Sequence, residues 1–165
     1  MTCDTLLVRV VTIAALAVPL AHAQKTEFTA EVVGVTEGDI LRVKHNGAEE
    51  KIRLQGIDCP EMNQTFGPQA KKFTRDLAVG KSVTVKVFEV DRFKRQVADI
   101  ILPDGKNLNQ EIVKAGYAWW FVRYAKNDRV LEKLEAEAKQ ARRGLWSQEL
   151  PTPPWEHRKH GRGAQ

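Results

Sequence analysis

Residues 40–61, ILRVKHNGAEEKIRLQGIDCPE, contain the pattern that decides the fold. Two strand-like runs at 40–44 and 51–57 flank the dipeptide Asn46-Gly47. Asn-Gly between two such runs is a strong signal for a β-hairpin, because both central residues of the tight turn need a positive φ. In the second run apolar and polar residues alternate, which indicates a strand with one buried face. This stretch therefore predicts two strands joined by a tight turn.

The rest of the chain adds strand and helix patterns in a simple order. Further strand-like runs occur at 28–35, 82–90 and 96–102, and runs with helical spacing at 66–78, 107–116 and 128–143. Five strands, with one helix inserted after the third and two helices at the end, predict a β-barrel with helices (α+β) of the oligonucleotide-binding (OB) type. An open α+β sheet with the same order of elements is the alternative. The sequence has no internal repeat.

The two ends of the chain differ in composition from this central part. Residues 1–23 contain an apolar run followed by the small residues Ala21 and Ala23, which is typical of a signal peptide cleaved on export. The run is too short for the roughly 20 residues of a membrane-spanning helix, so an uncleaved anchor is the weaker alternative. We expect a secreted or periplasmic monomer without a membrane anchor, with one domain at 24–148 and a flexible, basic, Pro-rich tail at 149–165.

The composition excludes two classes of protein, those stabilised by disulfides and those with a cysteine-rich zinc site. Cys3 belongs to the predicted leader, so the mature chain would contain Cys59 alone, and an internal hydrophobic core has to stabilise the fold. The formal net charge is +5. A positive charge favours polyanionic partners, but only weakly, since many basic proteins bind no polyanion.

Two aspartates at the ends of predicted strands are candidates for a metal site. Asp39 follows Glu37-Gly38 at the start of one strand, and Asp58 ends another. Carboxylates at strand ends can converge on one point while the backbone stays fixed, and oxygen ligands suit Ca²⁺, Mg²⁺ or Mn²⁺ rather than zinc. The alternative is that Asp39 is a turn residue and that Asp58 caps the backbone before Pro60.

Two arginines are candidates for binding a phosphate group. Arg53 lies inside a predicted strand, and Arg95 begins another after the turn-like residues 91–94. A guanidinium group binds phosphate with two charge-assisted hydrogen bonds, although both side chains could also simply face solvent. Arg53 and Asp58 are five positions apart, so a regular strand would place them on opposite faces. A shared site therefore requires a bend or bulge near Gly56.

Four further residues are candidates for supporting roles. Glu61 is the only carboxylate in the loop at 60–67 and could take a proton from water beside a cation, or it could be an ordinary exposed loop residue. Cys59 is predicted to be a small buried residue whose carbonyl matters more than its thiol, since the neighbouring carboxylates would raise the thiol pKa. Phe93 and Tyr124 flank charged residues and could stack on the bases of a nucleic acid.

Together these residues resemble the staphylococcal nuclease (thermonuclease) family over about residues 28–146. The matching motifs are Glu37-Gly38-Asp39, residues 53–61, residues 91–95, Leu108-Asn109 and Gly116-Tyr117-Ala118. The resemblance implies an OB-fold barrel, a Ca²⁺ cofactor, and endonuclease action on DNA and RNA that leaves 3′-phosphate ends. It also implies that calcium is held by Asp39, Asp58 and the carbonyl of Cys59, that phosphate is bound by the catalytic residues Arg53 and Arg95, and that the general base is Glu61.

The sequence departs from the family pattern at a few positions. Ile40 and Cys59 stand where the family often has Thr, Glu37 replaces the usual Asp, and Lys94 replaces the usual Gly. If the turn at Lys94 needs a positive φ, the lysine strains it and Arg95 could be displaced. Two other functions stay open: a non-catalytic nucleic-acid-binding barrel, and a surface interaction module that uses the Trp-rich segment and the tail.

Overall fold

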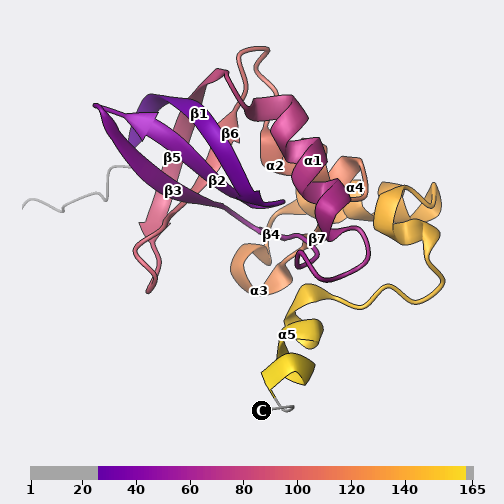
Figure 1. Ribbon diagram of the computed structural model, residues 1–165. Helices are drawn as coiled ribbons and strands as arrows, with labels where there is room; N and C mark the ends of the chain where they lie inside the picture. Colours follow the sequence, from indigo (N-terminus) through magenta and orange to yellow (C-terminus); the bar gives the residue numbers. More distant parts are fainter. Residues whose placement is uncertain (1–25, 163–165) are drawn as a thin grey trace, which may run out of the picture.

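A closed five-stranded barrel with helices at one end forms the part of the chain that the computed structural model describes, residues 26–162 (Figure 1). The barrel strands are β1 (Glu27–Glu37), β2 (Ile40–His45), β3 (Ala48–Leu54), β5 (Ser82–Val90) and β6 (Gln96–Ile101). They close in the order β1-β2-β3-β6-β5, and only the β3–β6 pair among them is parallel. The predicted OB-type barrel is therefore confirmed, and the open sheet is excluded.

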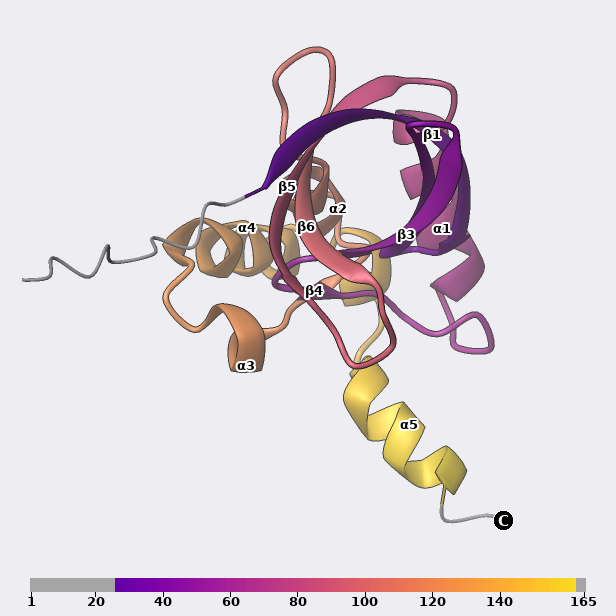
Figure 2. The ribbon, with the colours of Figure 1, turned by 90° about the vertical axis from the view of Figure 1, so that its left-hand side faces the viewer.

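The predicted hairpin joins β2 to β3. Asn46 and Gly47 have φ values of 48° and 81°, as the tight turn requires. The pairing register runs from His45 opposite Ala48 to Ile40 opposite Arg53. Seen along its axis, the barrel is a closed ring (Figure 2). The register therefore brings the start of β2 beside the end of β3, at one rim of the ring.

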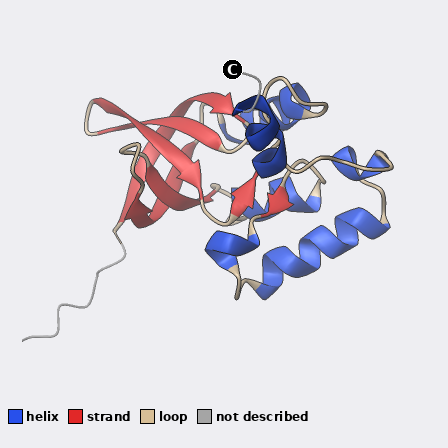
Figure 3. Cartoon of the chain, turned by 90° about the horizontal axis from the view of Figure 1, so that it is seen from below, coloured by secondary structure: helices blue, strands red, loops and turns tan. Residues whose placement is uncertain are grey.

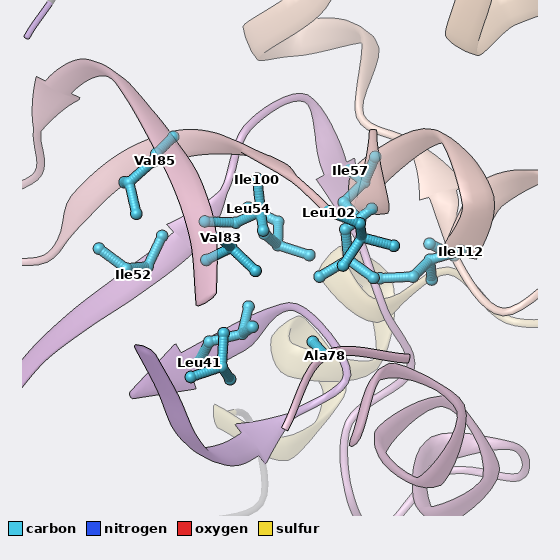
Figure 4. Packing of buried hydrophobic residues seen from close by; sticks show 14 of the residues in the cluster. Leu41, Ile52, Leu54, Ile57, Ala78, Val83, Val85, Ile100, Leu102 and Ile112 are labelled. Atoms are coloured by element: carbon cyan, nitrogen blue, oxygen red, sulfur yellow. The ribbon is translucent and has the colours of Figure 1, made fainter. Parts of the chain in front are cut away.

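Alternate side chains of the barrel strands form the core (Figure 4). The fully buried aliphatic residues of the strands include Leu41, Val43, Ile52, Leu54, Val83, Val85 and Ile100. Ile112 from helix α2 (Leu108–Lys114) extends the same core toward the helices. Burial of each such side chain contributes about 1.5–3 kcal/mol. This core stabilises the fold without a disulfide, and Cys59 is a free, buried cysteine.

The three predicted helices are present at the end of the barrel (Figure 3). They are α1 (Gly67–Ala78), α2 (Leu108–Lys114) and α4 (Arg129–Gln140). Helix α2 is capped by the side chain of Asn107, and α4 by that of Asp128; each accepts two backbone N–H groups. The sequence analysis did not predict the short helix α3 (Val122–Ala125) or the 3₁₀ helix η1 (Gly144–Ser147).

One predicted strand is interrupted. The run at 51–57 was predicted as one strand with a bend or bulge near Gly56, but β3 ends at Leu54 and a separate strand, β4 (Ile57–Asp58), follows. Strand β4 leaves the barrel and pairs with β7 (Trp119–Trp120) in a two-stranded sheet. The cause is Gly56, whose φ of 74° turns the chain away from the barrel.

The C-terminal segment also differs from the prediction. The tail at 149–165 was expected to lack regular structure, but Pro154–Arg162 form helix α5, which makes contacts with the rest of the molecule that are described below. Within residues 26–162, none of the helices has the length and apolar character needed to cross a bilayer. The predicted signal peptide at 1–23 lies outside the described residues, and the domain boundaries stay predictions.

Candidate active site

Three of the predicted site residues meet at the rim of the barrel where β2 begins and β3 ends. Asp39 immediately precedes β2, and its carbonyl accepts a hydrogen bond of 2.9 Å from the backbone N–H of Leu54. The Nη1 atom of Arg53 lies 2.5 Å from Asp39 Oδ2, and its Nη2 atom lies 2.7 Å from Asp58 Oδ1. Both aspartates are buried. Two carboxylates from different strands therefore converge on one cationic group.

The predicted bend between Arg53 and Asp58 is present at Gly56. There is no room for a side chain at this turn, since a Cβ on Gly56 would lie 2.9 Å from atoms of Ala125 and Leu131. The buried amide of Asn109 holds the turn by donating to the carbonyl of Gln55 at 3.0 Å. The bend thus brings Arg53 and Asp58 together although they are five positions apart in the sequence.

The turn before Asp39 is fixed by close packing. A Cβ on Gly38 would lie 2.8 Å from the sulfur of Cys59, so only glycine fits there. The hydroxyl of Thr74 on α1 donates a 2.6 Å hydrogen bond to the Gly38 carbonyl. The backbone N–H of Cys59 donates to Asp39 Oδ2, also at 2.6 Å. The Asp39 carboxylate is therefore held in place before any ligand binds.

Negative charge accumulates at this rim. Burial raises the pKa of Asp58, and burial together with the carboxylates of Asp39 and Glu61 raises the pKa of Glu37. For Arg53, burial alone would lower the pKa, but the adjacent aspartates raise it, so this side chain stays charged. Four carboxylates thus lie near one another at this rim, and a bound cation would relieve their repulsion.

The donor atoms suit a hard divalent cation. The carboxylates of Asp39 and Asp58 approach the two terminal nitrogens of the same guanidinium, at 2.5 and 2.7 Å, so both carboxylates lie beside Arg53. The Cys59 side chain is buried, as predicted, and burial raises the pKa of its thiol, which disfavours a thiolate ligand. No cluster of three or more His, Cys, Asp or Glu side chains within residues 26–162 is arranged to hold a metal. Backbone, water or substrate oxygens would have to complete the coordination of an ion at the two aspartates.

Glu61 lies in the loop between β4 and α1, beside Asp58. Its backbone N–H donates to Gln64 Oε1 at 2.9 Å, which fixes the start of the loop. Its side chain is 25% exposed and accepts a 2.6 Å hydrogen bond from Arg158 on α5. The same arginine donates to Asp58, so Glu61 and Asp58 face a common group. Glu61 therefore reaches the site and remains accessible to water.

Arg95 approaches the site from a different loop. Asp91 organises this loop: it accepts hydrogen bonds from the backbone N–H groups of Phe93 and Arg95 and from Arg95 Nε at 2.7 Å. Lys94 has a φ of 61°, so the condition under which the lysine would strain this turn is met. Arg95 nevertheless lies close enough to Glu37 for its charge to lower the pKa of that carboxyl in part. The structure thus pairs Arg95 with Asp91, and the effect on Glu37 is its link to the rim that carries Asp39 and Arg53.

Comparisons with known proteins agree with this geometry. The sequence model of the family described as "Staphylococcal nuclease homologue" matches residues 51–148. A protein from Escherichia coli O157:H7 named "Uncharacterized endonuclease" is 43% identical over 130 residues, which cover 78% of this chain and 84% of the relative. A "Micrococcal nuclease" from Shigella flexneri is 35% identical over 147 residues, which cover 84% of each chain.

The chain belongs to the staphylococcal nuclease family. It is therefore an enzyme that acts on nucleic acids, and its barrel is the OB-type barrel of that family. This excludes the non-catalytic barrel and the pure interaction module as the best descriptions of the chain. The roles of the individual residues in this nuclease stay predictions, which the geometry above supports.

The two aromatic residues predicted to stack on bases are exposed. Phe93 is 64% exposed, and the guanidinium groups of Arg92 and Arg95 lie 4.7 and 5.2 Å from its ring centre. Tyr124 is 56% exposed and packs edge-on against Phe121 at 4.9 Å. Both rings are accessible to a nuclease substrate, and Phe93 lies beside the proposed phosphate-binding arginine.

One residue that reaches the site of this nuclease was not predicted from the sequence. Arg158 on α5 (Pro154–Arg162) lies 2.7 Å from Asp58 Oδ2 and 2.6 Å from Glu61 Oε1. These carboxylates raise its pKa even though burial opposes the shift. Nothing in the sequence around Arg158 resembles a catalytic motif. The nearest signal is Trp155, a large aromatic residue that a solvated tail would not need.

Proposed function

We propose that this nuclease is a calcium-dependent endonuclease that cleaves DNA and RNA and leaves 3′-phosphate ends. The observation that carries the proposal is the convergence of the Asp39 and Asp58 carboxylates on the two terminal nitrogens of Arg53, at distances of 2.5 and 2.7 Å. Glu61 shares the guanidinium group of Arg158 with Asp58, and the positive charge of Arg95 acts on Glu37, which lies two residues before Asp39. A cation-binding centre, a base and two guanidinium groups are the parts that phosphodiester hydrolysis needs.

Asp39, Asp58 and the Cys59 carbonyl would hold the calcium ion, which when bound withdraws negative charge from a phosphate oxygen. The side chains of the protein account for the other requirements of the reaction. Arg53 and Arg95 donate hydrogen bonds to the non-bridging phosphate oxygens and stabilise the charge that grows on them. Glu61 accepts a proton from the water that attacks phosphorus in line, and the bond to the 5′-oxygen breaks, which leaves the phosphate on the 3′ side.

Phe93 and Tyr124 extend this proposal to the rest of the substrate. Each presents an exposed ring, and every nucleic acid base has a π-face that can stack on such a ring. Stacking of this kind does not depend on the sugar. It therefore agrees with a nuclease that accepts both DNA and RNA.

We also infer that the chain is exported and acts as a monomer. The leader at 1–23 supports cleavage after Ala23 and a secreted or periplasmic mature enzyme without a membrane anchor. A test is to express the full chain, isolate it from the periplasm and the medium, and determine its amino terminus by mass spectrometry. An amino terminus at Gln24 and a monomeric mass in solution are expected. Recovery of the uncleaved chain in the membrane fraction would contradict the proposal.

The decisive test of the activity is cleavage of plasmid DNA and of a defined RNA by the mature chain. Calcium should support internal cleavage of both substrates, and a chelator should abolish it. The products should carry a free 5′-hydroxyl, so a polynucleotide kinase should label their 5′ ends without prior phosphatase treatment. Mass spectrometry should find phosphate at the 3′ end. Binding in a gel-shift assay without cleavage at millimolar calcium would contradict the enzyme, and 5′-phosphate products would contradict the bond assignment.

A further inference from the structure

Helix α5 places a positive charge on the carboxylates that the proposed mechanism uses. Arg158 Nη2 lies 2.7 Å from Asp58 Oδ2, and its Nη1 lies 2.6 Å from Glu61 Oε1 and 3.4 Å from Asp58 Oδ1. With Arg53 on the other Asp58 oxygen, both oxygens of this carboxylate already accept charge-assisted hydrogen bonds. A cation cannot coordinate these oxygens fully while both guanidinium groups remain in place.

The position of Arg158 depends on an aromatic anchor one turn earlier in the helix. The ring of Trp155 stacks on Phe121, with centroids 5.2 Å apart and planes 2° from parallel. Its other neighbour is Trp119, which it approaches edge-on at 6.3 Å. Pro154, at the start of the helix, is buried. The segment is therefore packed against the nuclease domain through apolar contacts as well as through charge.

Two polar contacts add to this docking. The side chain of Gln64 donates to the carbonyl of Thr152 at 3.0 Å, and His157 Nε2 lies 3.0 Å from Asn63 Oδ1. Both partners on the domain belong to the loop that carries Glu61. Arg158 itself is 36% exposed, so its ion pairs are open to solvent at one side. Such contacts are individually weak, and a docked segment of this kind can be released by a competing ligand.

We propose that helix α5 is an autoinhibitory segment, in which Arg158 occupies the catalytic carboxylates and competes with the divalent cation. The proposal rests on the proposed function, since it assumes that Asp58 is a ligand of calcium. A guanidinium and a calcium ion need the same oxygens and repel each other at short range, so docking of α5 and binding of the ion oppose each other. Calcium then has two effects: it completes the catalytic site and it displaces the helix.

The proposal predicts a linkage that can be measured without any assay of activity. If α5 is docked in about nine of ten molecules, the apparent calcium affinity is about tenfold below that of the open form. Isothermal titration of calcium into the full mature chain should therefore show about tenfold tighter binding by Arg158→Gln than by the wild type. Lys159→Gln removes a neighbouring exposed charge and is the matched control. It should bind calcium as the wild type does.

A second variant and a second measurement separate docking from other effects of the substitution. Trp155→Ala removes the aromatic anchor without touching a carboxylate, and it should raise calcium affinity in the same direction as Arg158→Gln. In the wild type, hydrogen exchange of the α5 amides should be slow with chelator and faster with saturating calcium. Circular dichroism and the urea midpoint of each variant would establish that the barrel is intact.

The possible outcomes distinguish this proposal from the proposed function. Equal calcium affinities of the wild type, Arg158→Gln and Trp155→Ala would overturn autoinhibition and leave a calcium-dependent nuclease. Weaker calcium binding by Arg158→Gln would also overturn it, and would make Arg158 a supporting residue of the site. If none of the variants binds calcium, the calcium dependence in the proposed function fails, and the competition fails with it.

Discussion

The two arginines proposed to bind phosphate are held in different ways. Arg53 lies in β3 with its side chain 15% exposed, and its ion pairs reach Asp39 and Asp58, which come from two other parts of the chain. Arg95 follows a loop, is 23% exposed, and pairs with Asp91 four residues earlier on the same loop. Arg53 therefore helps to hold the carboxylates together, whereas Arg95 is held locally. Loss of the first should affect both fold and function, and loss of the second should affect function alone.

The largest effect is expected for Arg53→Ala. This change leaves the buried carboxylate of Asp39 without its counter-ion, and leaves Asp58 with the partly exposed Arg158 alone. Removing one partner of a buried pair costs about 3–5 kcal/mol of unfolding free energy. Nuclease activity should also fall by about 10³- to 10⁵-fold, by analogy with other arginines that bind a transferred phosphoryl group. Urea unfolding in chelator and the rate of DNA cleavage in calcium measure the two effects.

Arg53→Lys is the matched control for that experiment. It keeps the positive charge between the aspartates but lacks the planar fork that binds two phosphate oxygens. Most of the stability should therefore return, and most of the activity should not. If Arg53→Ala unfolds at the same urea concentration as the wild type, the guanidinium does not hold the carboxylates together.

Arg95→Ala should separate function from stability. Its partner Asp91 is 17% exposed but keeps the hydrogen bonds from the backbone N–H groups of residues 93 and 95, so the unfolding free energy should change by less than about 1 kcal/mol. Cleavage should nevertheless slow by about 10³- to 10⁵-fold. Arg92→Ala, in the same loop and also next to Phe93, is the control and should retain far more activity. A large loss of stability in Arg95→Ala would show that the two arginines do not differ as described.

Glu61→Gln should have a smaller effect on the rate than either arginine. The substitution preserves shape and a hydrogen-bond acceptor for Arg158, but it removes the carboxylate that takes the proton from water. A positioned general base typically contributes about 10²- to 10⁴-fold. The measurement is the single-turnover cleavage rate as a function of pH. In the wild type the rate should rise with pH as the general base loses its proton, and in the variant this rise should be absent. A wild-type rate would assign the base to another group.

The barrel and most of the site could be predicted because local patterns encode them. The Asn46-Gly47 turn fixes the β2–β3 register, and that register brings Asp39 and Arg53 to the same rim. The motif also contained Gly56, whose positive φ supplies the bend that Asp58 needs. Two short stretches of sequence, each with one turn, therefore bring Asp39, Arg53 and Asp58 together.

Helix α5 could not be predicted, because its position depends on contacts far away in the sequence. Trp155 packs on Phe121 and Trp119, and these rings are placed only when β7 pairs with β4. The segment has several prolines and no helical periodicity, so its composition resembles that of an unstructured tail. For the same reason the sequence around Arg158 does not predict its contact with Asp58, which lies 100 positions earlier in the chain.

The smallest effect is expected for Lys94→Gly, which tests the strain in the loop that carries Arg95. Lys94 has a φ of 61°, a conformation that costs an L-residue about 1–2 kcal/mol. Glycine removes this strain, but its more flexible unfolded state offsets part of the gain in stability. The glycine variant should therefore be more stable by about 0.5–1 kcal/mol in urea unfolding, and Lys94→Asn should fall in between. Asp91 already fixes the backbone and Nε of Arg95, so the cleavage rate should change little. A large gain in rate would instead mean that Lys94 holds Arg95 away from the phosphate, and that the loop, rather than the buried carboxylates, limits this nuclease.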